Sequence, residues 1–452
     1  MRSLSLLACL IFCVATASAQ GPPAGGPPPG AFSSCAAHAE GDRCAFETPL
    51  GKVQGVCRIM REGSPVCVPG STLPDSRPGR NTGANLRPPF GADIQSKSPQ
   101  AVPVRSHVPD TRQGSCFDDV KVTSCPKPGE AFYGQDGNYA GAVPSYRDNG
   151  DGTVSDLVTG LTWQKAHHAT RLGYYEAKAV CQSLALGGFH NWRLPSIKEL
   201  FSLADFRGSQ GAGRPYLDDN IFDFHEPEAS VLEGDRFAAT HRTGMMGQTW
   251  SSTIYTGVHY GRPGVEAAFF FNFLDGHIKQ APTSGRNRLF YRCVRGAPWG
   301  ENQFVDNGDG TVDDRTTDLE WQKVDDGQRR NWRQALAYCQ GLSLGGHHDW
   351  RLPNVKELET IVDYNHHAPA LDERYLRMSH PDGWFWSGTT HGDSIRMAAY
   401  VCFGPCTAVD GIDVHGAGAQ RSDPKTGDPS DYGSLGGQND EVRIKNYTRC
   451  VR

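Results

Sequence analysis

One module written twice constrains the fold of this chain more than any other feature. The stretch Tyr146–Arg295 returns, with changes, as Phe304–Arg452. Three pairs of matching residues are each 158 positions apart: Trp163 and Trp321, Cys181 and Cys339, and Trp192 and Trp350. Because several motifs keep one spacing, the repeat indicates duplication of a whole folded unit. Each copy has the size of an ordinary domain and is far too long for a solenoid repeat.

The two copies differ in length near their middles. Trp250 and Trp386 are matched at an offset of 136, whereas the final cysteines, Cys293 and Cys450, are matched at 157. Copy one therefore carries its longer insert at 208–247, and copy two carries its own at 404–437. Both inserts are rich in Gly, Asp and Pro, as surface loops are, and loops are where modules of one fold acquire separate specificities.

The first residues have the three parts of a secretory leader. A basic residue, Arg2, precedes an apolar run at 4–14 and a small-residue cleavage site that ends at Ala19. No later segment has the apolar length of a membrane helix. We therefore expect cleavage after Ala19 and a secreted, periplasmic or cell-surface protein.

Removal of the leader leaves twelve cysteines, an even number that in an exported chain predicts disulfides. The repeat makes the early and late cysteines of each copy equivalent, and sequence proximity suggests two local bridges. The predicted pairs are Cys181–Cys293, Cys339–Cys450, Cys402–Cys406 and Cys116–Cys125. Each long bridge is worth roughly 4 to 5 kcal/mol in the chain-entropy model. The pairing of the first four cysteines stays open.

Composition predicts the order of the remaining parts. The chain should contain a Gly/Pro-rich tether at 20–34, a small cysteine-rich module at 35–69, a disordered linker at 70–115, a first domain at 116–298 and a second at 299–452. The start of the first domain, 116–144, is expected to be a lead-in segment attached to copy one.

Each copy is predicted to be α+β, with two helices and short antiparallel sheets. Turn-forming residues at 149–152 separate the strands of a short meander. A first helix carries Cys181 and should end at the Gly187-Gly188 pair. A capping box formed by Ser196 and Glu199, repeated as Asn354 and Glu357, opens a second helix. A strand at 289–294 closes the module.

That order of parts resembles the C-type lectin-like fold. Both copies contain short motifs that are similar to those of the bacterial Lcl C-terminal domain family, a domain of unknown function. These motifs are Asp-Gly-Thr-Val, Trp-Gln-Lys, Trp-Arg-Leu-Pro-x-x-Lys-Glu-Leu, Trp-Ser and Arg-Cys-Val. The resemblance implies two tandem lectin-like domains in an exported protein. It also implies surface attachment, because the family's named member is an adhesin that binds host glycosaminoglycan.

The formal charge of −5 and the pI near 6.3 provide no global basic field for nucleic acid. A local basic patch near the end of copy one, with Arg286 and Arg288, is the candidate for an anionic ligand. Solvated residues on an edge strand are the simpler interpretation of the same arginines.

Aspartates in the meander turns are weak calcium candidates: Asp148, Asp151, Asp306 and Asp309. The stretch lacks the ligand spacing of an EF-hand, and Asp or Asn beside Gly is what a tight turn needs. We therefore expect turns here, with no cofactor and no resident metal.

The duplicated tryptophans are expected to form core anchors. The unduplicated aromatics are the better candidates for ligand contact: Tyr255, Tyr260, Trp384 and Phe385.

These features favour a non-enzymatic protein that binds an extracellular glycan or protein surface. One alternative is an enzyme on a scaffold like that of formylglycine-generating enzymes, which requires reactive cysteines. The other is a structural component of an envelope assembly. The ligand and the oligomeric state are left open.

Overall fold

The computed structural model describes residues 33–35, 43–48, 51–59, 65–69, 97, 100–167, 170–224, 247–432 and 439–452. The predicted leader, most of the tether and positions 70–96 of the linker lie outside them. The chain forms two compact units, 1–86 and 87–452. Among the described residues no helix has the length and apolar character needed to cross a membrane.

The smaller unit contains one antiparallel three-stranded sheet of β1 (Arg43–Thr48), β2 (Gly51–Ile59) and β3 (Pro65–Pro69). Two disulfides, Cys35–Cys57 and Cys44–Cys67, bridge it. Its buried hydrophobic cluster contains these four cysteines and Val66 alone among the described side chains. So small a core makes the unit dependent on its bridges.

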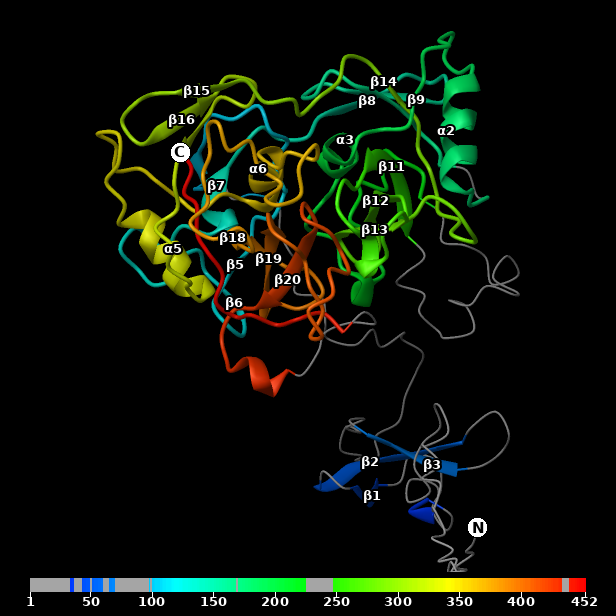
Figure 1. The fold of residues 1–452 in the computed structure, drawn as a ribbon, viewed down its shortest axis with the longest axis vertical. Coiled ribbons are helices and arrows are strands. Elements are labelled where there is room, and N and C mark those ends of the chain that lie inside the picture. Colours follow the sequence, from blue (N-terminus) through cyan, green and yellow to red (C-terminus); the bar gives the residue numbers. More distant parts are fainter. Residues whose placement is uncertain are drawn as a thin grey trace, which may run out of the picture. The chain divides into compact units, whose positions relative to one another are not determined.

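Copy one of the repeat contains two antiparallel sheets and two helices (Figure 1). The first sheet has the order β14-β10-β9-β8, and its strands are β8 (Tyr146–Asp148), β9 (Thr153–Asp156), β10 (Thr162–Gln164) and β14 (Val294–Arg295). The second sheet consists of β11 (Gln248–Ile254), β12 (Ala267–Asn272) and β13 (His277–Pro282). The helices are α2 (Tyr174–Ser183) and α3 (Ile197–Ser202).

Copy two repeats this arrangement. Its meander is β15 (Phe304–Asp306), β16 (Thr311–Asp314) and β17 (Leu319–Gln322), and its second sheet is β18 (Trp384–Thr390), β19 (Met397–Cys402) and β20 (Gln420–Pro424). The helices are α5 (Trp332–Gln340) and α6 (Val355–Thr360). Trp321 bridges to Val451 as Trp163 pairs with Val294. The predicted mixture of short antiparallel sheets and few helices is confirmed.

The second helix of each copy begins where the capping box predicts. The Ser196 side chain accepts a hydrogen bond from the Glu199 backbone N–H, and Asn354 does the same for Glu357. The first helix, by contrast, ends earlier than expected. α2 ends at Ser183, and the glycines Gly187 and Gly188, both with positive φ, form the following turn instead of the helix cap.

A disulfide closes each copy as the repeat predicts. Cys181 of α2 is bonded to Cys293, and Cys339 of α5 is bonded to Cys450. The two local pairs, Cys116–Cys125 and Cys402–Cys406, are also present.

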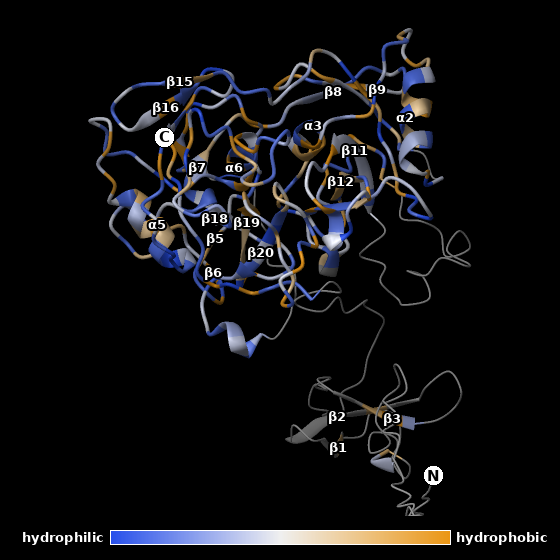
Figure 2. Cartoon of the chain, viewed as in Figure 1, coloured by the Kyte–Doolittle hydropathy of each residue, from blue (hydrophilic) through white to orange (hydrophobic). Residues whose placement is uncertain are grey.

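The duplicated tryptophans are core residues, as expected. All six are buried: Trp163, Trp192, Trp250, Trp321, Trp350 and Trp386. The short helices α3 and α6, where Figure 2 shows orange, hydrophobic segments, contribute Ile197, Leu200, Val355 and Leu358 to one large hydrophobic cluster that spans both copies. The copies therefore share a core.

A reciprocal pair of lysines holds the copies together where α3 contacts α6. Lys198 Nζ donates to the Thr360 carbonyl at 2.7 Å, and Lys356 Nζ donates to the Ser202 carbonyl at 2.8 Å. Lys198 matches Lys356, and Ser202 matches Thr360, so the contact has the self-complementary form of a two-fold interface. Burial lowers the pKa of both lysines to about 8.

The lead-in segment lies between the copies and packs against both of them, not against copy one alone. It contains four short strands, β4 (Val102–Pro103), β5 (Cys116–Phe117), β6 (Val122–Thr123) and β7 (Tyr139–Ala140). Residues 100–115, assigned above to the disordered linker, belong to this packed segment. Thr111 and Gln113 in it are buried.

Candidate functional site

A polar cleft in copy one is the best candidate for a ligand site. It encloses about 280 Å³ and is lined by residues that follow α3 and by the described part of the copy-one insert: Asp205, Arg207, Arg214, Leu217, Asp218, Asp219 and Asn220. All but one of these side chains are charged or carry an amide. The cleft therefore suits a ligand rich in hydrogen-bonding groups.

The chain that follows α3 positions these side chains through local turns. The Asp205 carboxylate accepts the backbone N–H of Arg207 at 3.0 Å, which turns the chain directly after the helix. The backbone of Asp205 donates to the Tyr216 carbonyl at 3.2 Å. Arg214 and Ser209 exchange two backbone hydrogen bonds, each 2.9 Å long. The rim of the cleft is therefore a closed loop.

An arginine of the lead-in pairs with two of the carboxylates that line the cleft. Arg112 Nη1 lies 2.5 Å from Asp218 Oδ2 and 3.4 Å from Asp205 Oδ2. Burial by itself raises the pKa of Asp218, but the hydrogen bond and charge of Arg112 outweigh it and bring that pKa below its ordinary value. Asp218 is therefore held as a carboxylate, while Asp219 and Arg214 are exposed to solvent.

The cleft lacks the geometry of a metal centre. Within the described parts of the chain, the one close grouping of three metal-ligating side chains is Cys35, Cys44 and Cys67, whose sulfurs are in disulfides. Carboxylates and guanidinium groups in alternation instead offer paired acceptors and donors for hydroxyl or amide groups.

Copy two arranges the equivalent residues differently. Asp363, the match of Asp205, has its carboxylate 2.7 Å from His366 Nδ1. Asp372, the match of Asp218, pairs at 2.7 Å with Arg374, which belongs to its own turn. The lead-in arginine that reaches into copy one has no counterpart in these contacts. The two copies therefore present different chemistry at matching positions.

Three of the aromatic residues predicted to contact a ligand are core residues. Trp384 and Phe385 are each 1% exposed and Tyr255 is 7% exposed, so the expectation of surface contact is corrected. Trp384 stacks on Tyr400 with ring centroids 4.9 Å apart and lies under the Arg443 guanidinium at 3.7 Å. These side chains stabilise the second sheet of copy two and its contact with copy one.

The other predicted contact residues lie at the surface but apart from the cleft lining. Tyr260 is half-buried in a left-handed turn (φ 50°), and its backbone N–H donates to the Asp413 carbonyl. Arg286 and Arg288 are exposed, and Arg288 pairs at 3.0 Å with Glu176 of α2. The structure does not bring these three residues together with the cleft.

The four calcium candidates form turns. Asp148 Oδ1 accepts the Gly150 N–H at 2.9 Å, and Asp151 Oδ1 accepts the N–H and hydroxyl of Thr153. Asp306 and Asp309 repeat these bonds in copy two. Lys165 and Lys323, which directly follow β10 and β17, neutralise the first aspartate of each turn.

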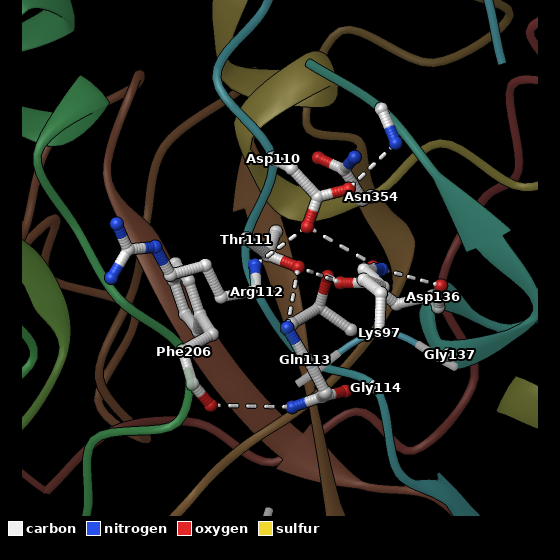
Figure 3. A network of polar contacts seen from close by, with 12 residues as sticks. Lys97, Asp110, Thr111, Arg112, Gln113, Gly114, Asp136, Gly137, Phe206 and Asn354 are labelled. Carbon is white, nitrogen blue, oxygen red and sulfur yellow. Dashed lines mark hydrogen bonds and ion pairs between the residues drawn. The ribbon is translucent and has the colours of Figure 1, made fainter. Parts of the chain in front are cut away.

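A buried polar network anchors the lead-in beside the cleft (Figure 3). Asp136 Oδ2 accepts hydrogen bonds from Thr111 at 2.8 Å and from Thr389 of copy two at 2.5 Å. Gln113 donates to the Thr390 carbonyl at 2.7 Å and accepts the Thr390 N–H at 2.8 Å. This segment, which also carries Arg112, is therefore fixed to copy two while it shapes the cleft of copy one.

A second charged cluster lies at the inter-copy seam, defined here as the contact between β13 and β20. His277 Nε2 lies 3.0 Å from Ser422 Oγ across the seam, and its ring stacks on His391 at 4.6 Å. The Lys279 ammonium pairs with Asp275 at 2.8 Å. Burial, then the charge of Arg421, lowers the pKa of His277 well below its ordinary value.

His415, which belongs to the copy-two insert, joins this charged cluster through Asp440. Its Nε2 lies 2.7 Å from Asp440 Oδ1, and the same carboxylate pairs with Arg421. Burial, followed by the positive charge of Arg421, lowers the pKa of His415 to about 4.

The cleft residues were not among those predicted from the sequence. Their signal was the dense run of charged residues between Asp205 and Asn220, at the start of the insert already singled out as a specificity loop. The family model of the Lcl C-terminal domain matches residues 152–295 and 310–422, more than half of the chain. Comparisons with curated proteins and with solved structures found no match.

Proposed function

Because this chain belongs to the Lcl C-terminal domain family in both of its copies, we propose that it is an exported, non-enzymatic binding protein. Its two copies attach to an extracellular glycan or protein surface. A C-type lectin-like fold for each copy is supported by three features. These are the helix pair, the loop-rich centre and the disulfide from the first helix to the last strand.

The state of the sulfur atoms carries this proposal. All twelve cysteines that follow the leader are bonded in six pairs. A thiolate nucleophile or copper ligand requires an unbridged cysteine, so oxidised cysteines favour a binding role over formylglycine-type chemistry. A count of free thiols in the purified protein tests the point: a thiol in either copy would favour the enzyme.

The disulfides also bear on the compartment. Bonds of this number persist in extracellular or periplasmic surroundings and are reduced in most cytosols. Export through the leader that ends at Ala19, to the periplasm, the cell surface or the medium, is part of the proposal.

The copy-one cleft is the proposed contact site. Planar carboxylate, amide and guanidinium groups recognise the hydroxyl and amide groups of a glycan or of a polar protein loop through paired hydrogen bonds. Asp219 is exposed, whereas Asp218 is held by Arg112. Asn220 and Arg214 are also exposed, and their side-chain hydrogen bonds, to Asp218 at 3.2 Å and to the Arg207 carbonyl at 3.5 Å, lie at the surface, where a ligand can compete for them.

A glycan and protein array tests the cleft. The intact chain is applied with calcium and with chelator, and we expect binding that does not depend on calcium. Asp219→Ala should weaken that binding by about tenfold, a loss of roughly 1.4 kcal/mol. Glu373→Ala is the matched control, because Glu373 is the exposed equivalent in copy two. Equal effects of the two substitutions would place the ligand elsewhere.

A further inference from the structure

The lead-in covers one face of copy two with an aromatic side chain. The Phe132 ring lies 6.2 Å from the Trp332 ring at the start of α5, and the Arg333 guanidinium lies 5.3 Å from the same Phe132 ring. Leu336, one turn further along α5, is 1% exposed.

Tyr139 of the lead-in extends this contact. Its hydroxyl accepts a hydrogen bond from Gln340 at 2.9 Å, and the Arg351 guanidinium lies 5.2 Å from the centre of its ring. The carboxylate of Asp136 then accepts the hydroxyl of Thr389. An aromatic–carboxylate–aromatic segment is therefore seated on copy two.

Copy one has the same face at equivalent positions. We call it the α2 face and define it by the matches of the covered copy-two residues: Tyr174, Tyr175, Lys178, Gln182, Arg193 and Thr253. The equivalence is structural as well as sequential. Thr253 Oγ1 accepts the Ile197 N–H at 3.0 Å, as Thr389 Oγ1 accepts the Val355 N–H at 3.0 Å.

No described segment covers the α2 face as the lead-in covers copy two. Tyr175 is 57% exposed, and the Arg193 side chain is 33% exposed where that of Arg351 is 3% exposed. Gln182 is exposed, and Thr253 is half-buried. The Thr389 hydroxyl donates a hydrogen bond to Asp136. The equivalent Thr253 hydroxyl has no such carboxylate acceptor among the described residues.

The charge of the α2 face indicates what it binds. Lys178 is exposed at the position of the buried Leu336, near the Glu266 carboxylate. Arg193 is already paired with Glu199, as Arg351 is with Glu357 beneath the lead-in, so Lys178 is the cation that this face adds. An occupant therefore needs an anionic group near its aromatic side chains.

We propose that the α2 face binds an acidic, aromatic-containing segment of a partner polypeptide, as the lead-in binds the matching face of copy two. The carboxylate faces Thr253 and Lys178, and aromatic rings lie on Arg193 and beside Tyr175. The inference goes beyond the cleft and does not depend on it, since the two sites share no residue.

A peptide of residues 114–142, with its Cys116–Cys125 bridge closed and a fluorophore at one end, is the probe. It carries Asp136, Phe132 and Tyr139 together with an excess of acidic residues. Added to the intact chain and followed by anisotropy, it should bind saturably. Lys178→Glu in the chain, and Asp136→Asn in the peptide, should each weaken binding by about tenfold.

Val180→Glu is the matched control, because Val180 is exposed on α2 but points away from the Tyr175 and Gln182 side of the helix. Both chain variants change exposed positions, so unfolding midpoints near that of the wild type verify their folds. Absence of saturable binding, or equal binding by Lys178→Glu, overturns the proposal. A chain dimer in sedimentation that Lys178→Glu dissolves would assign the face to a second copy and also overturn it.

Discussion

The two copies have the same internal bonds but different surroundings. Arg193–Glu199 and Arg351–Glu357 have the same bidentate geometry, yet the arginine side chain is 33% exposed in copy one and 3% exposed in copy two. The difference comes from Tyr139, which covers Arg351 alone. A duplicated motif therefore retains its local contacts, while the contribution of its ion pair to stability depends on whether the lead-in covers it.

The largest loss of unfolding free energy should come from removing the long disulfide, and it should be the same in both copies. Replacing Cys181 and Cys293 by serine, or Cys339 and Cys450, opens loops with sequence separations of 112 and 111. Since loop length sets the denatured-state entropy, each double variant should lose about 4 to 5 kcal/mol of unfolding free energy. Urea unfolding measures both losses, and the Cys402→Ser/Cys406→Ser variant, with a short loop, is the control. A clear inequality between the long-loop variants would show that the copies do not close in the same way.

The next largest loss of stability should differ between the two copies. Arg351→Met leaves the buried Glu357 carboxylate without its charged partner and with the Asn354 backbone N–H as a remaining donor, and it should cost about 3 to 5 kcal/mol. Arg193→Met leaves Glu199 with the backbone donors of Ser196 and Trp299 and with nearer solvent, so about 2 kcal/mol is expected. Unfolding free energies of the two variants, measured at one pH, provide the comparison. Equal costs would mean that the cover over Arg351 has no energetic consequence.

The inter-copy seam should make the protein sensitive to acid. The pKa of His415 is about 4 in the folded chain and near 6.5 when unfolded, so the unfolded state binds more protons between these values. Stability is therefore complete above pH 6.5 and is lost as the pH falls, by about 2 kcal/mol between pH 7 and pH 5. The low pKa of His277 acts in the same direction.

Urea unfolding at pH 7, 6 and 5 measures this slope. His415→Gln should flatten it, whereas His347→Gln, at a position with a 42% exposed side chain, should leave it unchanged. A slope that is the same in the wild type and in His415→Gln would remove this histidine as the cause.

The smallest effect should again be equal in the two copies. Asp148→Asn and Asp306→Asn each break an ion pair with a lysine at an exposed turn. Water screens such pairs, so the unfolding midpoint should not shift measurably in either variant. Calcium should likewise leave the wild-type midpoint unchanged. A stabilisation by calcium that Asp148→Asn abolishes would contradict the assignment of these residues to turns.

Features with a local cause could be predicted from the sequence. The capping boxes at Ser196 and Asn354 depend on residues three positions apart, and the aspartate turns depend on a neighbouring glycine. The long-range pairs Cys181–Cys293 and Cys339–Cys450 were also predictable, because duplication supplied two examples of one geometry.

Features that depend on a segment present once could not be predicted. The lead-in reaches copy two through contacts such as Gln113 with Thr390, far apart in sequence and without a repeated counterpart. Trp384 and Phe385 were assigned to the surface because they are unduplicated. Trp384 is buried because it stacks on Tyr400 beneath Arg443, and Phe385 is buried because it packs against Phe403 and Tyr447. The cleft was missed for a related reason: Arg112 lies in a stretch whose composition suggested disorder.

The crossed lysine contacts have a consequence for the fate of the protein after proteolysis. Lys198 donates to the Thr360 carbonyl, and also to Gly300 in the stretch that joins the copies, while Lys356 donates to Ser202 in return. A single cut within 296–303 would therefore not release a half. The two fragments should co-migrate under native conditions and separate only in denaturant, so a nicked molecule would keep both of its faces in their original geometry.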